Sequence, residues 1–227
     1  MLNDFLSGSA AWGVLLTLAA FGLGVLINKR TGQAIFNPLL LGTAFVIVVL
    51  SVLKIPYDTY AASASPVSYL LLPATVSLAV PLYRQLELLK TYPKAIFGGI
   101  FAGVLTAMVS VFALSLMFGL NHEQYVTLLP KSITTAIGMG ISEKMGGIVT
   151  ITVVVIIVTG ILGNILADTI CRLCKIEDPI AKGLAIGTSA HALGTAKAME
   201  LGEIEGAMSS LSIVVCGILT VISVSIF

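Results

Sequence analysis

Five apolar runs, each close to the length that a helix needs to cross a bilayer, constrain this chain more than any other feature. They lie near residues 9–27, 35–53, 95–118, 148–170 and 206–226, and a transmembrane helix needs about 20 apolar residues. Only 10% of the 227 residues are charged, and the mean hydropathy is +1.06, whereas a soluble domain carries about 25% charged residues. The sequence therefore predicts an all-α integral membrane protein with one membrane domain, residues 1–227.

Three further segments are apolar but interrupted. Residues 66–83 contain Pro73 and Pro81, and residues 181–200 are rich in glycine and hydroxyl side chains. Both are long enough to cross, whereas 127–147 is too polar and too broken for a regular span. Irregular backbone at membrane depth is tolerated only where protein covers it or where it lines a wet cavity. We therefore expect 127–147 to be re-entrant, entering and leaving on the same side.

The basic residues of the short connections predict an orientation. Connections 28–34, 84–94 and 171–182 carry lysine and arginine, whereas 200–205 carries three glutamates and no base. Basic connections face the cytoplasm. This pattern predicts about seven crossings plus one re-entrant segment, with the N-terminus outside, the C-terminus in the cytoplasm and 200–205 on the outer side.

A short repeat relates the two halves of the chain. The pattern Gly-x-Leu-Thr begins at Gly103 and again at Gly217, and the two interrupted crossings run in opposite directions. Together these features predict two inverted repeats, about 1–118 and 119–227, with antiparallel broken helices that cross at mid-membrane. Paired interrupted segments of this kind are typical of the substrate sites of transporters.

The broken helices predict an anion site. A helix that breaks at mid-membrane leaves N–H groups without partners at the start of its second half, and these donors, together with the helix dipole, favour an anion. We expect Pro73, Pro81 and Gly187 to mark the breaks. The predicted substrate-binding residues offer a hydroxyl, an ionisable group or a close backbone; they are Thr75, Ser77, Lys131, Ser132, Thr134, Thr135, Thr188, Ser189, His191, Gly194 and Thr195.

Other interpretations of these residues remain open. Small residues also let membrane helices pack closely, which would account for Gly187 and Gly194, and His191 can simply donate a hydrogen bond to a neighbouring helix. A hydrolase needs a nucleophile beside a positioned base, but Ser189 and His191 would diverge on a regular helix. We therefore expect no enzyme, no metal, no cofactor and, at a net charge of +1, no nucleic-acid partner.

Three stretches of the sequence resemble the LrgB/CidB membrane proteins, a family that also includes YohK. They are LLLPATVSLAVPLY (70–83), LLPKSITTAIGM (128–139) and AKGLAIGTSAHALGTAKAMELGEIEGAMSSLS (181–212). One departure is Ala136, where many relatives have proline. The resemblance implies a multi-pass protein of the bacterial cytoplasmic membrane that acts with a small LrgA-like or CidA-like membrane partner.

The resemblance implies two different functions. Bacterial members are described as holin-like or antiholin-like regulators of murein hydrolase activity, autolysis and programmed cell death. Other relatives are tied to pyruvate uptake, and plastid relatives to glycolate and glycerate exchange. A holin-like hole needs little beyond amphipathic spans, so the polar interrupted helices favour a transporter of small monocarboxylates, with the antiholin-like regulator as the alternative. The glycines of 95–118 also suggest a homodimer.

Overall fold

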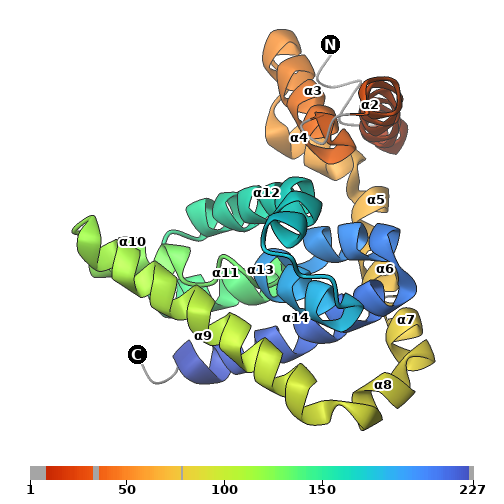
Figure 1. Ribbon diagram of the computed structural model, residues 1–227. Helices are drawn as coiled ribbons and strands as arrows, with labels where there is room; N and C mark the ends of the chain where they lie inside the picture. The colour runs from red at the N-terminus through yellow and green to blue at the C-terminus, as the bar shows by residue number, and fades with distance from the viewer. Residues whose placement is uncertain (1–8, 33–35, 78, 225–227) are drawn as a thin grey trace. The chain divides into compact units, whose positions relative to one another are not determined.

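The computed structural model describes residues 9–32, 36–77 and 79–224, and every regular element in these ranges is a helix (Figure 1). The chain divides into two compact units, Met1–Ser77 and Leu78–Phe227, which are described separately. Among the described residues, four helices are long and apolar enough to cross a membrane: α2, α9, α12 and α14. The predicted all-α membrane protein is therefore confirmed. Its inverted repeats stay a prediction.

The first unit packs two apolar helices against each other. They are α2 (Ala10–Thr31) and the shorter α3 (Pro38–Leu53), followed by α4 (Tyr57–Ser63), α5 (Ser65–Tyr69) and α6 (Leu71–Ser77). Gly24 allows the close approach of α2 to α3, because a Cβ atom there would lie 2.6 Å from the carbonyl oxygen of Pro38. The prolines of the predicted crossing 66–83 lie in a series of short helices in place of one long helix.

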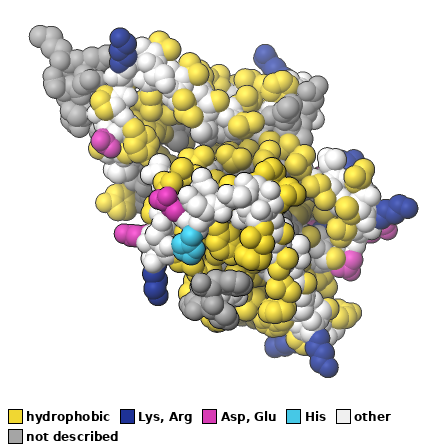
Figure 2. All heavy atoms as spheres, turned by 90° about the vertical axis from the view of Figure 1, so that its left-hand side faces the viewer, with side chains coloured by type: hydrophobic (Ala, Val, Ile, Leu, Met, Phe, Trp, Pro, Cys, Tyr) yellow, Lys and Arg dark blue, Asp and Glu magenta, His cyan; other side chains and the backbone are white. Residues whose placement is uncertain are grey.

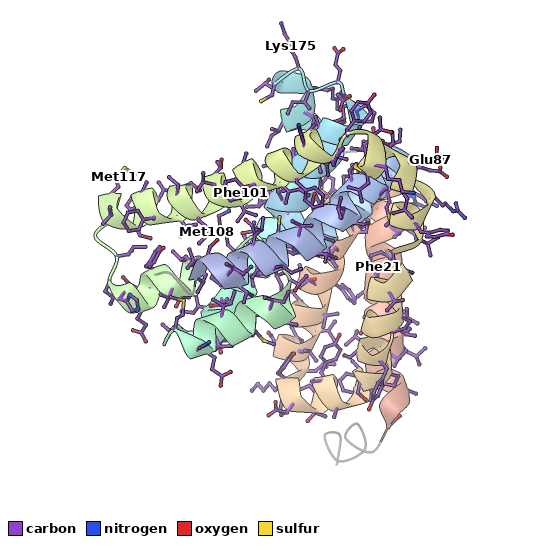
Figure 3. The ribbon with its side chains drawn as sticks, turned by 90° about the horizontal axis from the view of Figure 1, so that it is seen from below. Phe21, Glu87, Phe101, Met108, Met117 and Lys175 are labelled. Atoms are coloured by element: carbon purple, nitrogen blue, oxygen red, sulfur yellow. The ribbon has the colours of Figure 1, made fainter. Side chains whose placement is uncertain are left out.

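The second unit begins with α7 (Ala79–Arg84) and α8 (Leu86–Thr91) and is built on three long helices: α9 (Pro93–Met117), α12 (Val149–Leu173) and α14 (Glu203–Val224). In Figure 3, Phe101 and Met108 lie along α9, and Met117 marks its end. Its core brings Ile96, Ile100 and Met108 of α9 against Met208 of α14, each less than a tenth exposed. On the face drawn in Figure 2, hydrophobic side chains predominate and charged ones are few, as expected of a surface in contact with lipid.

Between α9 and α12 the chain forms a hairpin of two short helices, α10 (His122–Leu128) and α11 (Thr135–Lys144). The base of this hairpin is held by hydroxyl groups: the backbone N–H of Ile148 donates to Oγ1 of Thr127 over 2.8 Å. Oγ1 of Thr152, on α12, lies 2.9 Å from the carbonyl oxygen of Thr127 and 2.7 Å from Oγ of Ser142. Residues 127–147 therefore begin and end at one point of the second unit, and their re-entry into the membrane stays a prediction.

Helix α13 (Pro179–Leu201) is also a hairpin, in which two helical arms meet at His191. A Cβ atom at Gly194 would lie 3.1 Å from the carbonyl oxygen of Ile186, whereas residues eight apart on a continuous helix are separated by about 12 Å. Both arms also contact Ser209: its Oγ lies 2.7 Å from Oγ1 of Thr195, and a Cβ atom at Gly187 would lie 2.6 Å from its carbonyl oxygen. The prediction that 181–200 crosses the membrane is therefore wrong.

The hairpin changes which connections share an end of the second unit. Leu201 lies beside Lys182 in one pocket, and Arg84 and Glu203 are 3.8 Å apart. Connections 84–94, 171–182 and 200–205 thus lie at one end, although the charge pattern placed the last of them on the opposite side. Helix α14 runs away from this end, because Val224 lines a cavity with Lys144 of α11. The expectation that the end of α14 lies on the same side as the basic connections is therefore also wrong.

Candidate functional site

The tips of the two hairpins meet beside the middle of α9. There a groove of about 620 Å³ runs between α9 and the first arm of α13. Its apolar residues are mostly alanine and glycine, and its polar residues are Thr106, Ser110, Lys131, Ser132, Asp178, Thr188 and Ser189. A volume of this size falls within the range of about 300–1,000 Å³ that is usual for small-molecule sites.

Two helices approach closely along the groove because α9 carries glycine there. A Cβ atom at Gly103 would lie 2.7 Å from Oγ1 and 2.8 Å from Cβ of Thr188, and one at Gly99 would lie 3.0 Å from Cδ1 of Leu184. Gly103 is therefore required for the close packing of α9 against α13, a role that small residues often have in membrane helices. The consequence for the site is that the Thr188 side chain lies directly against α9.

Lys131 is the basic residue of the groove, at the tip of the α10–α11 hairpin. Its Nζ donates to Oγ of Ser132 over 2.9 Å, and an ammonium group has three N–H donors. In the part of the chain that the structure describes, no carboxylate lies within 4.0 Å of it. An ammonium group removed from water and without a carboxylate partner is suited to hold an anion.

Two hydroxyl groups of the groove, both on the first arm of α13, donate to their own helix. Oγ1 of Thr188 lies 2.8 Å from the carbonyl oxygen of Leu184, and Oγ of Ser189 lies 2.7 Å from that of Ala185. A hydroxyl has one hydrogen to donate, so binding an anion would require these side chains to give up a local bond. Ser189 is exposed, whereas Thr188 is buried. Ser189 is therefore the freer of the two donors.

The structure brings together four of the predicted substrate-binding residues and places others elsewhere. Lys131, Ser132, Thr188 and Ser189 line the groove. Thr134 and Thr135 begin α11 and are absent from its lining. Ser77 belongs to the first unit, where its Oγ donates to the carbonyl oxygen of Ala74 over 2.6 Å.

The structure gives a different result for each of the three residues predicted to break a helix. Pro73 lies within α6. The side chains of Thr75 and Pro81 lie outside the part of the chain that the structure describes. Gly187 is a packing position against α14, and the backbone of α13 turns instead at His191.

His191, Gly194 and Thr195 lie behind the groove, among α12, α14 and the other arm of the hairpin. Nε2 of His191 lies 3.0 Å from the carbonyl oxygen of Ile156 on α12. Since a carbonyl oxygen can only accept, Nε2 carries the hydrogen. Oγ1 of Thr195 donates to the carbonyl oxygen of His191 over 2.9 Å. These residues thus hold the hairpin in shape.

Three polar groove residues were not among the predicted site residues. Thr106 and Ser110 are spaced four apart on α9, which places them on one face of that helix. Asp178 accepts a hydrogen bond from the backbone N–H of Ala181 over 2.8 Å and caps α13. An aspartate directly before a proline is a signal for a helix start, and this signal marks the entrance of the groove in the sequence.

Comparison with known proteins shows similarity to one family. Residues 17–227 match the LrgB-like family. Antiholin-like protein LrgB of Bacillus cereus (strain B4264) is 36% identical over 217 residues, which cover 95% of this chain and 94% of that relative. The protein of the same name from Bacillus anthracis (strain CDC 684 / NRRL 3495) is equally similar over the same share of both chains. No solved structure matches this chain.

Proposed function

Since this chain belongs to the LrgB-like family, we propose that it acts as an antiholin-like membrane protein that restrains murein hydrolase activity and autolysis. The observation that carries this proposal is the similarity to relatives named antiholin-like, at 36% identity over 95% of the chain. The closed centre of the second unit supports it: the hairpin tips and the fully buried Ile100, Ile156 and Met208 fill the space between the long helices. A protein that restrains lysis must not itself open a hole.

The groove favours a second candidate, a carrier of small monocarboxylates such as pyruvate, lactate or glycolate. Its specific support is Lys131, whose ammonium group lies beside the hydroxyl groups of Ser132 and Ser189 and has no carboxylate of the described residues within 4.0 Å. One cation and a few hydroxyl donors match the needs of one carboxylate. In this reading the two hairpins approach the substrate from opposite ends of the second unit.

Location and partners follow from the same comparison. We place the protein in the bacterial cytoplasmic membrane, with the basic end of the second unit (84–94 and 171–182) in the cytoplasm. The resemblance of the sequence to LrgB-type proteins implies a small LrgA-like membrane subunit as partner, and this partner is part of the proposal. A homodimer stays a prediction from the glycines of α9.

Two measurements on one pair of variants separate the candidate functions. The first measures detergent-induced autolysis in cells that lack their own LrgB-like protein. The second measures pyruvate uptake into proteoliposomes that contain the purified chain. Lys131→Ala removes the cation of the groove, and Lys144→Ala, at the exposed end of the same hairpin, is the matched control.

If the chain is a regulator without a carrier function, the parent and both variants slow autolysis, and none of the three takes up pyruvate. A carrier gives saturable uptake that Lys131→Ala weakens and Lys144→Ala leaves unchanged. If cells with and without the chain lyse at the same rate, the antiholin-like proposal fails. If the liposomes leak a neutral dye as readily as pyruvate, the carrier fails.

A further inference from the structure

We infer that His191 is a positioning residue: its imidazole ring anchors the tip of the α13 hairpin to α12 and thereby fixes Thr188 and Ser189 in the groove. The consequence for binding rests on the proposed carrier function, whereas the geometry can be measured without it. The inference assigns His191 neither to the substrate nor to a proton path.

The backbone of His191 requires an explanation that lies in its side chain. Its φ is 44° and its ψ is −137°, a left-handed φ that glycine adopts readily and other residues adopt at a cost. The chain is rich in glycine, with 22 in 227 residues, yet it carries histidine at this turn. Strained conformations persist where the surroundings over-determine them, and here the ring supplies the contacts that do so.

The ring lies in a recess on α12. Nε2 of His191 donates to the carbonyl oxygen of Ile156 over 3.0 Å, and the residue is 4% exposed. A Cβ atom at Gly160 would lie 2.7 Å from Cε1 and 2.9 Å from Nε2 of the ring. Such an atom would also lie 2.7 Å from Cδ1 of Leu193, so Gly160 provides the space that the imidazole ring and the Leu193 side chain share, and alanine at this position would push both out.

A second polar contact holds the turn on the same helix. Nδ2 of Asn164, one turn after Gly160 on α12, donates to the carbonyl oxygen of Leu193 over 2.8 Å. His191 and Leu193 thus both attach the turn to α12. Gly163 lies between these contacts, where a Cβ atom would come within 2.2 Å of Cβ of Ala190 and would collide with it. The side of α12 that faces the turn is therefore shaped to receive it.

The hydroxyls of the groove lie on the opposite side of the turn. Thr188 and Ser189 precede His191 by three and two residues and line the groove against α9. The histidine ring is absent from the groove lining. A shift of the turn away from α12 would displace both hydroxyls, because the same short piece of backbone carries them. The contact between His191 and Ile156 therefore acts on the groove through the backbone.

The position of Thr188 provides a test that does not depend on activity. In a full-length protein whose native cysteines Cys171, Cys174 and Cys216 are replaced, Thr188→Cys in proteoliposomes is treated with a membrane-permeant maleimide. Thr188 is 6% exposed, so labelling is slow while the tip is anchored. His191→Ala should raise the labelling rate at least about tenfold, because the turn loses its anchor. His191→Gln should stay within about twofold of the parent, because an amide N–H replaces that of the ring.

Gly160→Ala supplies the same test from α12, in case His191→Ala fails to fold. It should raise labelling as His191→Ala does, and the double variant should be no worse than either single variant, because both remove one contact. Gly98→Ala is the matched control, since nothing lies within 4 Å of a Cβ atom there. If His191→Gln labels as fast as His191→Ala, or if Gly160→Ala leaves labelling unchanged, the inference is wrong.

Pyruvate uptake by the His191 and Gly160 variants and their parent, all with Thr188 retained, links the geometry to the proposed function. His191→Ala and Gly160→Ala should raise the half-saturating concentration, while His191→Gln stays near the parent. If no protein takes up pyruvate, including the parent, the carrier function fails and the labelling rates still decide the role of His191. If uptake needs histidine while labelling is insensitive to its loss, His191 contacts the substrate and the positioning role is overturned.

Discussion

Nη1 of Arg84 and Oε1 of Glu203 lie 3.8 Å apart. In the chain 118 residues separate these two side chains, and the charge pattern placed them on opposite sides of the membrane. The pair is exposed and contributes little to stability. Its importance is topological, because two residues in contact share a side of the bilayer. Within the second unit the chain between them runs away from this end through α9 and returns through α12, and each of the two hairpins begins and ends at the same end of the unit.

The first prediction is that reporters on the two ends of the second unit separate as this topology requires. Single cysteines at Lys175 and Glu203 should react with an impermeant maleimide from one side of the membrane, and one at Lys144 from the other. The positive-inside rule makes the first side cytoplasmic. Reaction at Glu203 and Lys144 from the same side would contradict the α13 hairpin.

A second prediction concerns the charge of Lys131. Its ammonium group is a cation of the groove, so Lys131→Gln should raise the half-saturating concentration for pyruvate roughly tenfold to a hundredfold, because removing a hydrogen bond to a charged ligand costs about 1.5–3 kcal/mol. Uptake by Lys131→Arg should stay closer to that of the parent, since arginine remains charged. Equal half-saturating concentrations in the parent and in Lys131→Gln would assign anion binding to another group.

Ser189→Ala provides the third prediction. Removing a hydrogen bond to a charged ligand costs about 1.5–3 kcal/mol, which raises the half-saturating concentration roughly tenfold to a hundredfold. The side chain is exposed in the groove, so the amount of folded protein should not change in size-exclusion chromatography. Ser110→Ala removes a groove hydroxyl from α9, the facing helix. Comparing its half-saturating concentration with that of Ser189→Ala shows whether the two hydroxyls contribute equally. An unchanged half-saturating concentration in Ser189→Ala would remove this residue from the site.

The fourth prediction concerns stability. A Cβ atom at Gly187 would lie 2.6 Å from the carbonyl oxygen of Ser209 and 2.7 Å from Cβ of Ser212. Because backbone atoms cannot move aside cheaply, Gly187→Ala should destabilise the second unit by about 1–3 kcal/mol. Thermal unfolding in detergent measures this loss. Gly140→Ala, on an open helix surface with nothing within 4 Å, should unfold near the temperature of the parent.

Hydrophobicity predicted the long helices of this fold because bilayer thickness determines their length. Helices α2, α9, α12 and α14 agree with the predicted runs to within a few residues. The hairpin of 127–147 was also predictable, since its polarity excludes a regular span. In contrast, the turn in α13 depends on one histidine in a left-handed conformation, with neither proline nor glycine at that position. A segment of this length and polarity is equally consistent with a broken helix that crosses the membrane.

The chemistry of the candidate site was easier to predict from the sequence than the residues that form it. Hydroxyl side chains and Lys131 in interrupted segments indicated a polar site, and Lys131, Ser132, Thr188 and Ser189 do line one groove. The sequence could not divide the hairpin into a side that faces the groove and a side that faces α12. That division depends on which glycines of α9 and α12 admit the hairpin, and such pairings are visible only in three dimensions.

The hairpin form of α13 has a consequence for how the protein is made. A ribosome releases α13 before α14, yet Gly187 and Thr195 both pack against Ser209 of the later helix. Until α14 inserts, the polar arms lack one of the three long helices against which they pack, and polar groups in lipid without partners are costly. The hairpin should therefore enter the membrane late, together with α14. A nascent chain that stops at residue 202 should keep 179–201 accessible to protease at the surface where synthesis takes place.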